Sequence, residues 1–299
     1  MPAVTVKEDK QQKVAAMRQR VMQLAQRIAD PDFGDETFRS YLEFLTRFHQ
    51  YSFYNVCLIA AQCPQATYVA GFRRWLELGR YVRKGEKGIA IFVPFVGKRQ
   101  AVEPDGQSNA DADVPEPVEA RASRPIRFGI GYVFDVSQTD GEGEVPSAFR
   151  MDLGEGVAPV YEALAKFAEG EGIMLKQGAA LLTGVNQVIR GASTGGTVYI
   201  NEAAPVGSQV QTLVHELAHE MLHQKWQGDA ISSALREGEA EAVAAVVMQH
   251  LGFDTGGYNA DYIRSHGCSA EQVVKSMDRI AACAHRIVEG IIEHSGGVA

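Results

Sequence analysis

The sequence predicts an α+β fold in two domains, residues 1–145 and residues 150–299. Apolar residues recur at helical spacing near both ends of the chain, and β-rich segments lie between them. A glycine-rich and acidic stretch, residues 139–156, separates the two parts and marks the expected boundary. With 299 residues, of which 45% are apolar, the chain can bury a sizeable core.

The first domain is expected to start with helices. Residues 35–62 predict an interrupted helical region with a stripe of aromatic residues, and such rings usually pack in a core. Residues 72–76 predict a short helical turn. Residues 8–29 predict an amphipathic helix, whose apolar face is formed by Val14, Met17, Val21, Leu24 and Ile28.

Two β-rich segments follow, and an acidic segment separates them. Residues 89–94 and residues 126–136 are rich in β-branched and aromatic residues, so we expect them to pair as strands. Residues 100–125 contain many acidic, Ser, Ala and Pro residues and no apolar periodicity. This composition predicts a disordered acidic insertion within the first domain, and not a linker between domains.

The second domain is expected to be mainly helical, with a small sheet. A helix is predicted near residues 157–171. The β-rich residues 197–200 are expected to form a sheet edge along which an extended peptide can lie. Ser269 is expected to cap a closing amphipathic helix that runs to Glu293.

A metal-ligand pattern lies on the predicted helix at residues 210–222. His215 and His219 are about 40° apart around a helix, so both imidazoles can reach one ion. Glu216 lies beside them, where it can take a proton from metal-bound water instead of binding the metal. This H-E-x-x-H arrangement is typical of zinc-dependent hydrolases. The alternative is two ordinary helix histidines.

Catalytic zinc usually has three protein ligands, and the downstream helix at residues 236–247 offers the third. Carboxylates on this otherwise apolar helix are costly unless a cation compensates them. We assign Glu237 to one Zn²⁺ per chain. Glu241, on the same face, is assigned to orient a ligand histidine, and Glu239 is the reserve candidate. The alternative is a charge cluster favoured by the helix dipole.

The HELAHE run and the E-x-E-A-E helix resemble the gluzincin metallopeptidases, and within them the ImmA/IrrE-like group. The spacing departs from that of the metzincins, because Leu222 and Lys225 stand where that family has Gly and a third His. His223 is therefore expected next to the ligands or on the surface. A polar group is the candidate source of an oxyanion-stabilising side chain. It contains Tyr258, Asp261, Tyr262 and His266.

A basic window with interleaved aromatic residues covers residues 68–99. It holds eight basic and two acidic residues, +6 in a chain of -8. Single-stranded nucleic acid is held in this way, since cations follow the phosphates while rings stack on bases. The alternative is a solvated hairpin face.

The N-terminal motifs resemble the single-stranded-DNA-binding domain of ArdC-type antirestriction proteins, which is followed by a metallopeptidase domain with HExxH. The motifs are Tyr54-Asn55, GFRRW at residues 71–75, LGR at 78–80, KGEKG at 84–88 and FDVSQT at 134–139. The resemblance implies that the protein shields incoming plasmid or mobile-element DNA from host restriction. The expected DNA-binding residues are Tyr54, Asn55, Arg73, Arg74, Trp75, Arg80, Arg83, Lys84 and Lys87.

Whole-chain properties restrict the function further. A net charge of -8 is too small for a DNA mimic. The four cysteines lack CxxC spacing and indicate free thiols, and no run reaches the 18 apolar residues of a membrane span. We therefore expect a soluble, cytoplasmic protein. Three functions stay open: an active zinc peptidase with a protein substrate, a DNA-binding protein whose zinc site is structural or vestigial, and a regulator that binds DNA and cleaves one specific repressor.

Overall fold

The chain is described by a computed structural model. The residues that it describes are 3–30, 34–95, 127–145, 157–178, 183–184, 187–188, 190–223, 231–253 and 269–295. The predicted insertion at residues 100–125 lies outside them, and so does the polar group at residues 258–266. The α+β organisation in two domains is confirmed.

Helices dominate the described chain. They are α1 (Ala3–Ala29), α2 (Gly34–Arg47), α3 (Phe53–Gln62), α4 (Phe72–Glu77), α6 (Ala158–Gly170), α7 (Val206–His223), α8 (Ser233–His250) and α10 (Ala270–His294). Each helix predicted from the sequence is present. Ser269 caps α10 as predicted: its side chain accepts from the Gln272 backbone N–H, and the Gln272 side chain accepts from the Ser269 N–H.

The strands are short and form four small sheets among the described residues. They are β1 (Val69–Gly71), β2 (Arg80–Val82), β3 (Ile89–Phe95), β4 (Arg127–Asp135), β5 (Thr139–Gly141), β6 (Met174–Gln177), β7 (Thr183–Gly184), β8 (Gln187–Val188), β9 (Gly191–Ser193) and β10 (Thr197–Ile200). A 3-10 turn, η1 (Val136–Gln138), joins β4 to β5.

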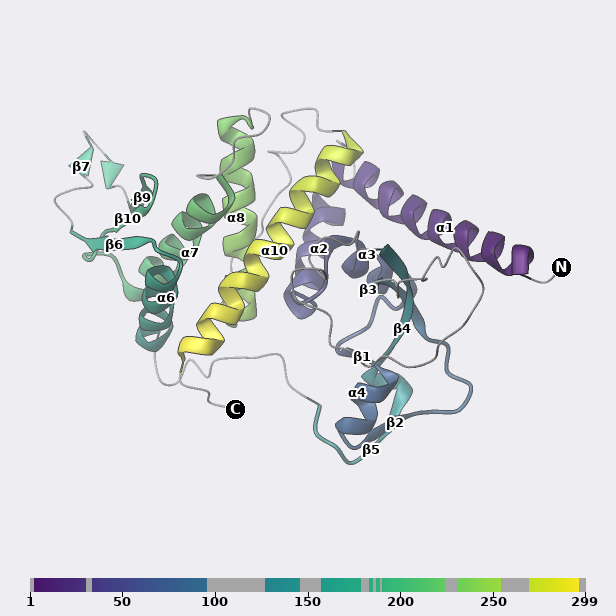
Figure 1. Ribbon diagram of the computed structural model, residues 1–299. Helices are drawn as coiled ribbons and strands as arrows, with labels where there is room; N and C mark the ends of the chain where they lie inside the picture. The colour runs from purple at the N-terminus through teal and green to yellow at the C-terminus, as the bar shows by residue number, and fades with distance from the viewer. Residues whose placement is uncertain are drawn as a thin grey trace, which may run out of the picture.

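The N-terminal sheet has the order β1-β4-β3 and is antiparallel throughout. Ile91 lies opposite Gly131, so the two segments predicted to pair across the insertion do pair. Helix α3 packs on this sheet through Ile89, Ile91 and Val133, which are buried in the core. Beyond the sheet, α4 and the β2–β5 pair form a lobe at the lower edge of the molecule in Figure 1.

In the C-terminal sheet, β10 lies between β6, its parallel partner, and β9, its antiparallel partner. The prediction that residues 197–200 form the sheet edge is therefore wrong, because β10 uses its backbone groups on both sides. Among the described strands, β6 and β9 are the two edges of this sheet, and β9 lies against α7. A peptide can add to the sheet only at such an unpaired edge.

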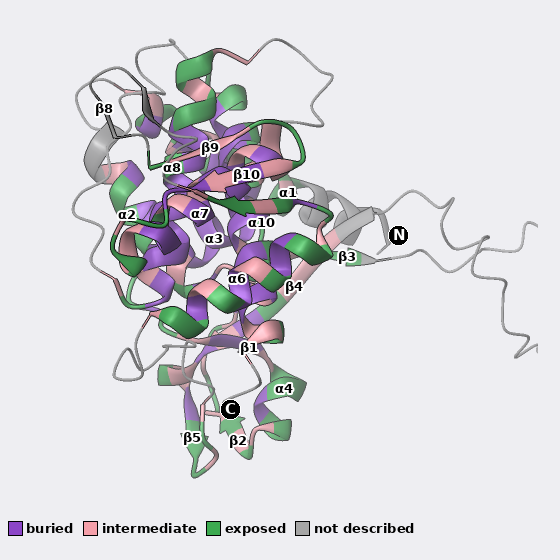
Figure 2. Ribbon diagram, turned by 90° about the vertical axis from the view of Figure 1, so that its left-hand side faces the viewer, coloured by how far each residue is buried: buried purple, intermediate pink, exposed green. Residues whose placement is uncertain are grey.

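A single hydrophobic core joins the two domains. Helix α10 runs diagonally across the centre of the molecule and contacts α1 and α3 on one side and α6 and α8 on the other (Figure 1). Buried residues continue through α3, α7 and α10 (Figure 2). Val21 and Ile28 of α1 belong to the same cluster as Ile280 and Ile287 of α10. Cutting the chain at the predicted boundary would expose this shared core, so the experiments below use the full chain.

The expectations about membrane spans and cysteines can also be compared with the structure. None of the helices that the structure describes has an apolar stretch long enough to span a bilayer. Cys57, Cys63 and Cys283 are free thiols, as predicted. Cys268 lies outside the described residues.

Candidate metal centre and nucleic-acid interface

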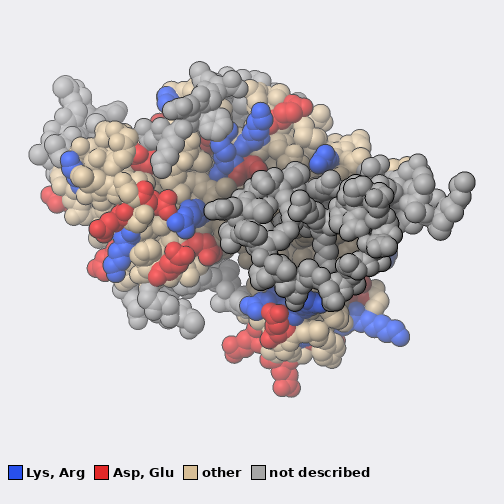
Figure 3. Space-filling view, viewed as in Figure 1, with Lys and Arg blue, Asp and Glu red and all other residues tan. Residues whose placement is uncertain are grey.

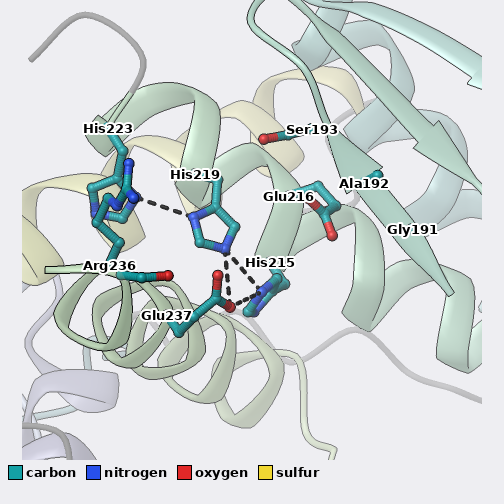
Figure 4. Close-up of a pocket in the computed structure, with 10 residues that line it drawn as sticks. Gly191, Ala192, Ser193, His215, Glu216, His219, His223, Arg236 and Glu237 are labelled. Carbon is teal, nitrogen blue, oxygen red and sulfur yellow. Dashed lines mark hydrogen bonds and ion pairs between the residues drawn. The ribbon is translucent and has the colours of Figure 1, made fainter. Parts of the chain in front are cut away.

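Three side chains from α7 and α8 converge on one point (Figure 4). The Nε2 atoms of His215 and His219 are 3.1 Å apart, and Glu237 Oε2 lies 3.4 Å from each of them. The helical spacing of four residues sets both imidazoles on one face of α7, as predicted. Glu237 enters from the second turn of α8, which begins after the N-cap Ser232.

The triangle of ligand atoms has the size that a metal ion requires. Tetrahedral bonds of about 2.0 to 2.1 Å place neighbouring ligand atoms about 3.3 to 3.4 Å apart. Burial lowers the pKa of both His215 and His219, which keeps the imidazoles neutral and able to donate a lone pair. Two imidazole nitrogens and a carboxylate at these distances fit a divalent cation.

A chain of hydrogen bonds behind His219 fixes which of its nitrogens faces this point. His219 Nδ1 is 3.1 Å from His223 Nδ1, and His223 Nε2 is 3.2 Å from Glu239 Oε2. Arg279 donates to the other oxygen of Glu239. Every partner is satisfied when His219 Nδ1–H donates to His223 and His223 Nε2–H donates to Glu239. His219 Nε2 then carries a lone pair toward His215 and Glu237.

The assignment of Glu241 needs correction. Glu241 is exposed, and the part of the chain that the structure describes shows no hydrogen bond from it to a ligand histidine. The reserve candidate Glu239 is fully buried and supports His219 through His223. Burial alone would raise the pKa of Glu239, but hydrogen bonds from His223 and Arg279 outweigh it and lower the pKa.

Glu216 stands beside the converging ligands and under strand β9 (Figure 4). It is 8% exposed, and burial, together with the nearby Glu237 and Glu220 carboxylates, raises its pKa to about 7. Glycine at position 191 allows β9 to lie this close to α7, because a Cβ there would collide with the Thr212 side chain. Glu220 holds the adjoining turn by accepting from the backbone N–H groups of Gly195 and Gly196 at 3.0 and 2.7 Å.

These side chains open into a pocket of about 460 Å³. Its wall on the sheet side is β9, which sequence reasoning did not assign to the site. The wall on the helical side includes Ser233 and Arg236 at the start of α8. The order of the strands around β10 decides this arrangement, and no local pattern at residues 191–193 signals it.

The residues predicted to bind DNA divide into buried and exposed sets. Trp75 is fully buried and donates from its indole to the Phe134 carbonyl at 3.0 Å. Asn55 is 8% exposed and exchanges two hydrogen bonds of 2.8 Å with the backbone of Phe92. The Tyr54 ring is half-buried against Phe53 and Phe92. Trp75 and Asn55 hold the domain together and present no free face for a base, and the Tyr54 ring packs within the same domain.

Three of the predicted arginines are engaged within the protein. Arg80 donates to Thr139 and to the carbonyls of Gly141 and Gly143. Arg83 pairs with Glu86 at 2.8 Å and with Asp140 at 3.4 Å. Arg74 pairs with Glu77 at 3.1 Å. The β2–β5 pairing brings Asp140 beside the basic window, and Figure 3 shows basic and acidic side chains together on this lobe.

Comparison with known proteins finds a matching family model for each of the two domains. Residues 12–133 match the family model described as the N-terminal domain of the anti-restriction factor ArdC. Residues 179–255, which include α7 and α8, match the peptidase family model described as the IrrE N-terminal-like domain. The chain therefore joins an ArdC-type N-terminal domain to an IrrE-like peptidase domain.

A curated relative and two solved structures are similar to this chain. An uncharacterized protein of Bacillus anthracis is 28% identical over 83% of this chain, which spans 46% of that relative's length. The antirestriction protein ArdC of plasmid R388, solved with Mn(II), is 18% identical with a TM-score of 0.46. The comparison covers 82% of this chain and 85% of that one. Its metal-free structure gives 19% identity and a TM-score of 0.44, covering 80% and 85%.

The ArdC-type N-terminal domain exposes aromatic rings that the predicted binding set left out. Phe72, Tyr81 and Tyr132 are 52 to 56% exposed. Tyr132 lies on β4 next to the buried Val133, so its side chain points away from the face that α3 covers. This alternation in residues 131–133 is the signal that identifies Tyr132 from sequence. Arg73, Lys84 and Lys87 are exposed around these strands, and the structure shows no ion pair for them among the described residues.

Proposed function

We propose that this protein binds single-stranded DNA through its N-terminal domain and protects incoming plasmid or mobile-element DNA from host restriction. Its C-terminal domain is proposed to be a zinc-dependent peptidase. The match to the ArdC N-terminal domain supports the first part. The observation that carries the second is the triangle of His215, His219 and Glu237, with Glu216 beside it.

The proposed DNA contacts come from exposed rings and free cations. Phe72, Tyr81 and Tyr132 offer faces on which bases can stack, and Arg73, Lys84 and Lys87 offer charges to phosphates. This set replaces Trp75 and Asn55, which are buried and bonded. Because stacking tolerates every base, we propose binding without strong sequence preference, and weakening as salt rises.

Replacing the rings should weaken DNA binding measurably. Each base–ring stack contributes about 1 to 3 kcal/mol, so Tyr81→Ala and Tyr132→Ala should each raise the Kd for a single-stranded oligonucleotide by about fivefold or more. The measurement is a fluorescence-anisotropy titration at fixed salt.

The matched control is Met174→Ala, which removes a 57% exposed apolar side chain in the other domain and should leave the Kd unchanged. Replacing Lys84 and Lys87 together should also flatten the dependence of log Kd on log salt. Unchanged binding in both tyrosine variants would remove these rings from the interface.

For the peptidase, the proposed ligands are His215, His219 and Glu237. A bound Zn²⁺ supplies Lewis-acid polarisation of a peptide carbonyl and makes water more acidic. Glu216 is placed to accept the proton of the attacking water on its carboxylate and to pass it to the departing peptide nitrogen. His223 and Glu239 hold the His219 ring in the orientation that faces the pocket.

Strand β9 is the proposed track for the substrate backbone. Its side away from β10 is unpaired among the described strands, and Gly191, Ala192 and Ser193 line the pocket beside Glu216. An extended peptide that adds to this edge would run past the ligand triangle. Side-chain specificity would then come from the pocket walls, to which Ser233 and Arg236 contribute.

Loss of the two histidines should remove one zinc site. We expect a His215→Ala, His219→Ala variant to bind one fewer Zn²⁺ per chain than the wild type, because two of three protein ligands are gone. Metal analysis after dialysis against Zn²⁺ gives this number. Glu241→Ala, which removes another exposed carboxylate of the same helix, is the control and should bind the wild-type number.

The second candidate function is a regulator that binds DNA and cleaves one specific repressor or host factor. The pocket holds a proton acceptor, Glu216, beside the three candidate ligands. A purely structural metal site does not need such a group, so this arrangement favours a hydrolytic function over a structural metal. Comparing the proteins cleaved in cells by the wild type and by Glu216→Ala distinguishes this function from general proteolysis.

A further inference from the structure

A second group of histidines lies where the two domains meet, away from the pocket of α7. His49 follows the end of α2, His250 is the last residue of α8, and His285 lies in the middle of α10. Glu289 stands one helical turn beyond His285, on the same face of α10. The group therefore joins the N-terminal helices to two helices of the C-terminal domain.

The imidazoles in this group have buried nitrogen atoms that lack hydrogen-bond partners. His49 Nδ1, His285 Nδ1 and His250 Nε2 have no hydrogen-bond partner among the described residues. Buried polar atoms are nearly always paired, so three in one cluster call for an explanation. His250 is 4% exposed, and its Nδ1 lies 3.3 Å from the Thr46 carbonyl. When Nδ1–H donates to that carbonyl, Nε2 carries the lone pair, as in histidines that bind metals.

Ligand atoms of three of these residues are close enough to share an ion. One nitrogen each of His49 and His285 and a carboxylate oxygen of Glu289 all lie within 4.8 Å of one another. His49 Nε2 is 3.8 Å from Glu289 Oε1. Closing such a triangle onto a tetrahedral metal moves each ligand atom by about 0.8 Å at most, which side-chain rotation can supply. The His250 ring packs edge-on to His49 at 4.6 Å, where it limits the rotation of His49.

The protonation and charge of the residues in this cluster are compatible with metal binding. Burial, with the neighbouring His250 and His285 rings, lowers the pKa of His49 to about 4, so its imidazole is neutral at neutral pH. The Glu289 side chain is 43% exposed, which leaves an entry path from solvent and supplies a negative charge. Neutral imidazoles and one carboxylate are ligands that Zn²⁺ and similar divalent metals prefer.

We propose that His49, His285 and Glu289 form a second divalent-metal site, which ties the N-terminal domain to α10. This site is independent of the peptidase centre. Its ligands come from elements 236 residues apart in sequence, so a bound ion restrains the docking of the two domains. The ion is therefore a structural link, and its binding stabilises the folded full-length chain.

The test separates this site from the peptidase centre by starting from a His215→Ala, His219→Ala background. Calorimetric titration with Zn²⁺ should show about one ion bound per chain in this background, and about two in the wild type. Adding Zn²⁺ should also raise the thermal-unfolding midpoint of the background variant. Adding His285→Ala should abolish both the binding and the shift.

Glu289→Gln in the same background keeps the side-chain volume and loses only the charged ligand. It should weaken Zn²⁺ binding by at least about 10- to 100-fold, the loss that even outer contacts of a metal site produce. Glu293→Gln, exposed one turn further along α10, is the matched control and should bind like the background. No Zn²⁺ binding in the His215→Ala, His219→Ala background would overturn the proposal, even if the wild type binds one ion at the peptidase centre.

Discussion

Glu239→Ala is expected to lower the free energy of unfolding by about 3 to 5 kcal/mol, the cost of removing one partner of a buried ion pair. Glu239 is 0% exposed and accepts hydrogen bonds from Arg279 and from His223. Without this carboxylate, the Arg279 side chain, which is 22% exposed, loses its ion pair with Glu239. Urea unfolding of the full chain, followed by circular dichroism, measures the change.

The exposed Glu241, two residues further along the same helix, provides the control. Glu241→Ala should change the free energy of unfolding by about 0.5 kcal/mol or less, as exposed substitutions usually do. The two variants should also differ in metal binding, since Glu239 orients His219 through His223 and such outer contacts are worth about 10- to 100-fold in affinity. Equal stability of the two variants would contradict the role given to Glu239.

The candidate metal centre was predictable because it is encoded locally. His215, Glu216 and His219 lie within two turns of one helix, and helical spacing alone sets them on one face. Glu237 followed from the cost of carboxylates on an apolar helix. The sequence did not show whether Glu239 or Glu241 supports the candidate ligand histidines. That depends on α10, because Arg279 of this helix, 40 residues after Glu239, donates to Glu239.

The proposed DNA-binding residues were harder to predict. Charge and aromatic content do not show which cations form ion pairs within the protein or which rings are buried. The basic window counted Arg83 as free, but η1 and β5 return to β2 and bring Asp140 against it. Trp75 looked available beside two arginines, yet its indole fills the core of the lobe. The prediction that residues 197–200 form the sheet edge was wrong for a similar reason, because their sequence predicts a strand but not the strands that pair with it.

The shared core also depends on contacts between distant parts of the chain. Each helix was predictable from its own periodicity, and the Gly-rich stretch suggested two separable units. Periodicity identifies the apolar face of α1 but not the surface that covers it, which includes α10 from the far end of the chain. The sequence also does not predict that His49, His250 and His285 lie together, because only contacts between distant helices bring them into one group.

Glu216→Ala is expected to reduce peptide hydrolysis by about 10²- to 10⁴-fold or more, the usual effect of losing a general acid–base group. The change removes the proton acceptor and leaves His215, His219 and Glu237 in place, so Zn²⁺ binding should persist. The rate is measured on denatured casein or on a quenched fluorescent peptide library, with zinc content determined on the same sample. Glu216→Gln, which keeps the shape of the side chain, should be equally inactive.

Single-stranded DNA binding should be unchanged in Glu216→Ala, because the exposed rings Tyr81 and Tyr132 belong to the other domain. We expect protection of incoming DNA to follow the N-terminal domain, so this variant should still protect, whereas Tyr81→Ala, Tyr132→Ala should not. If the two sites act separately, Glu216→Ala should lose hydrolysis and keep protection, and the double tyrosine variant should lose protection and keep hydrolysis. A folded, zinc-loaded Glu216→Ala protein that binds DNA normally and yet fails to protect would make cleavage of a host factor the leading mechanism, because the only group removed is the proton acceptor of the peptidase centre.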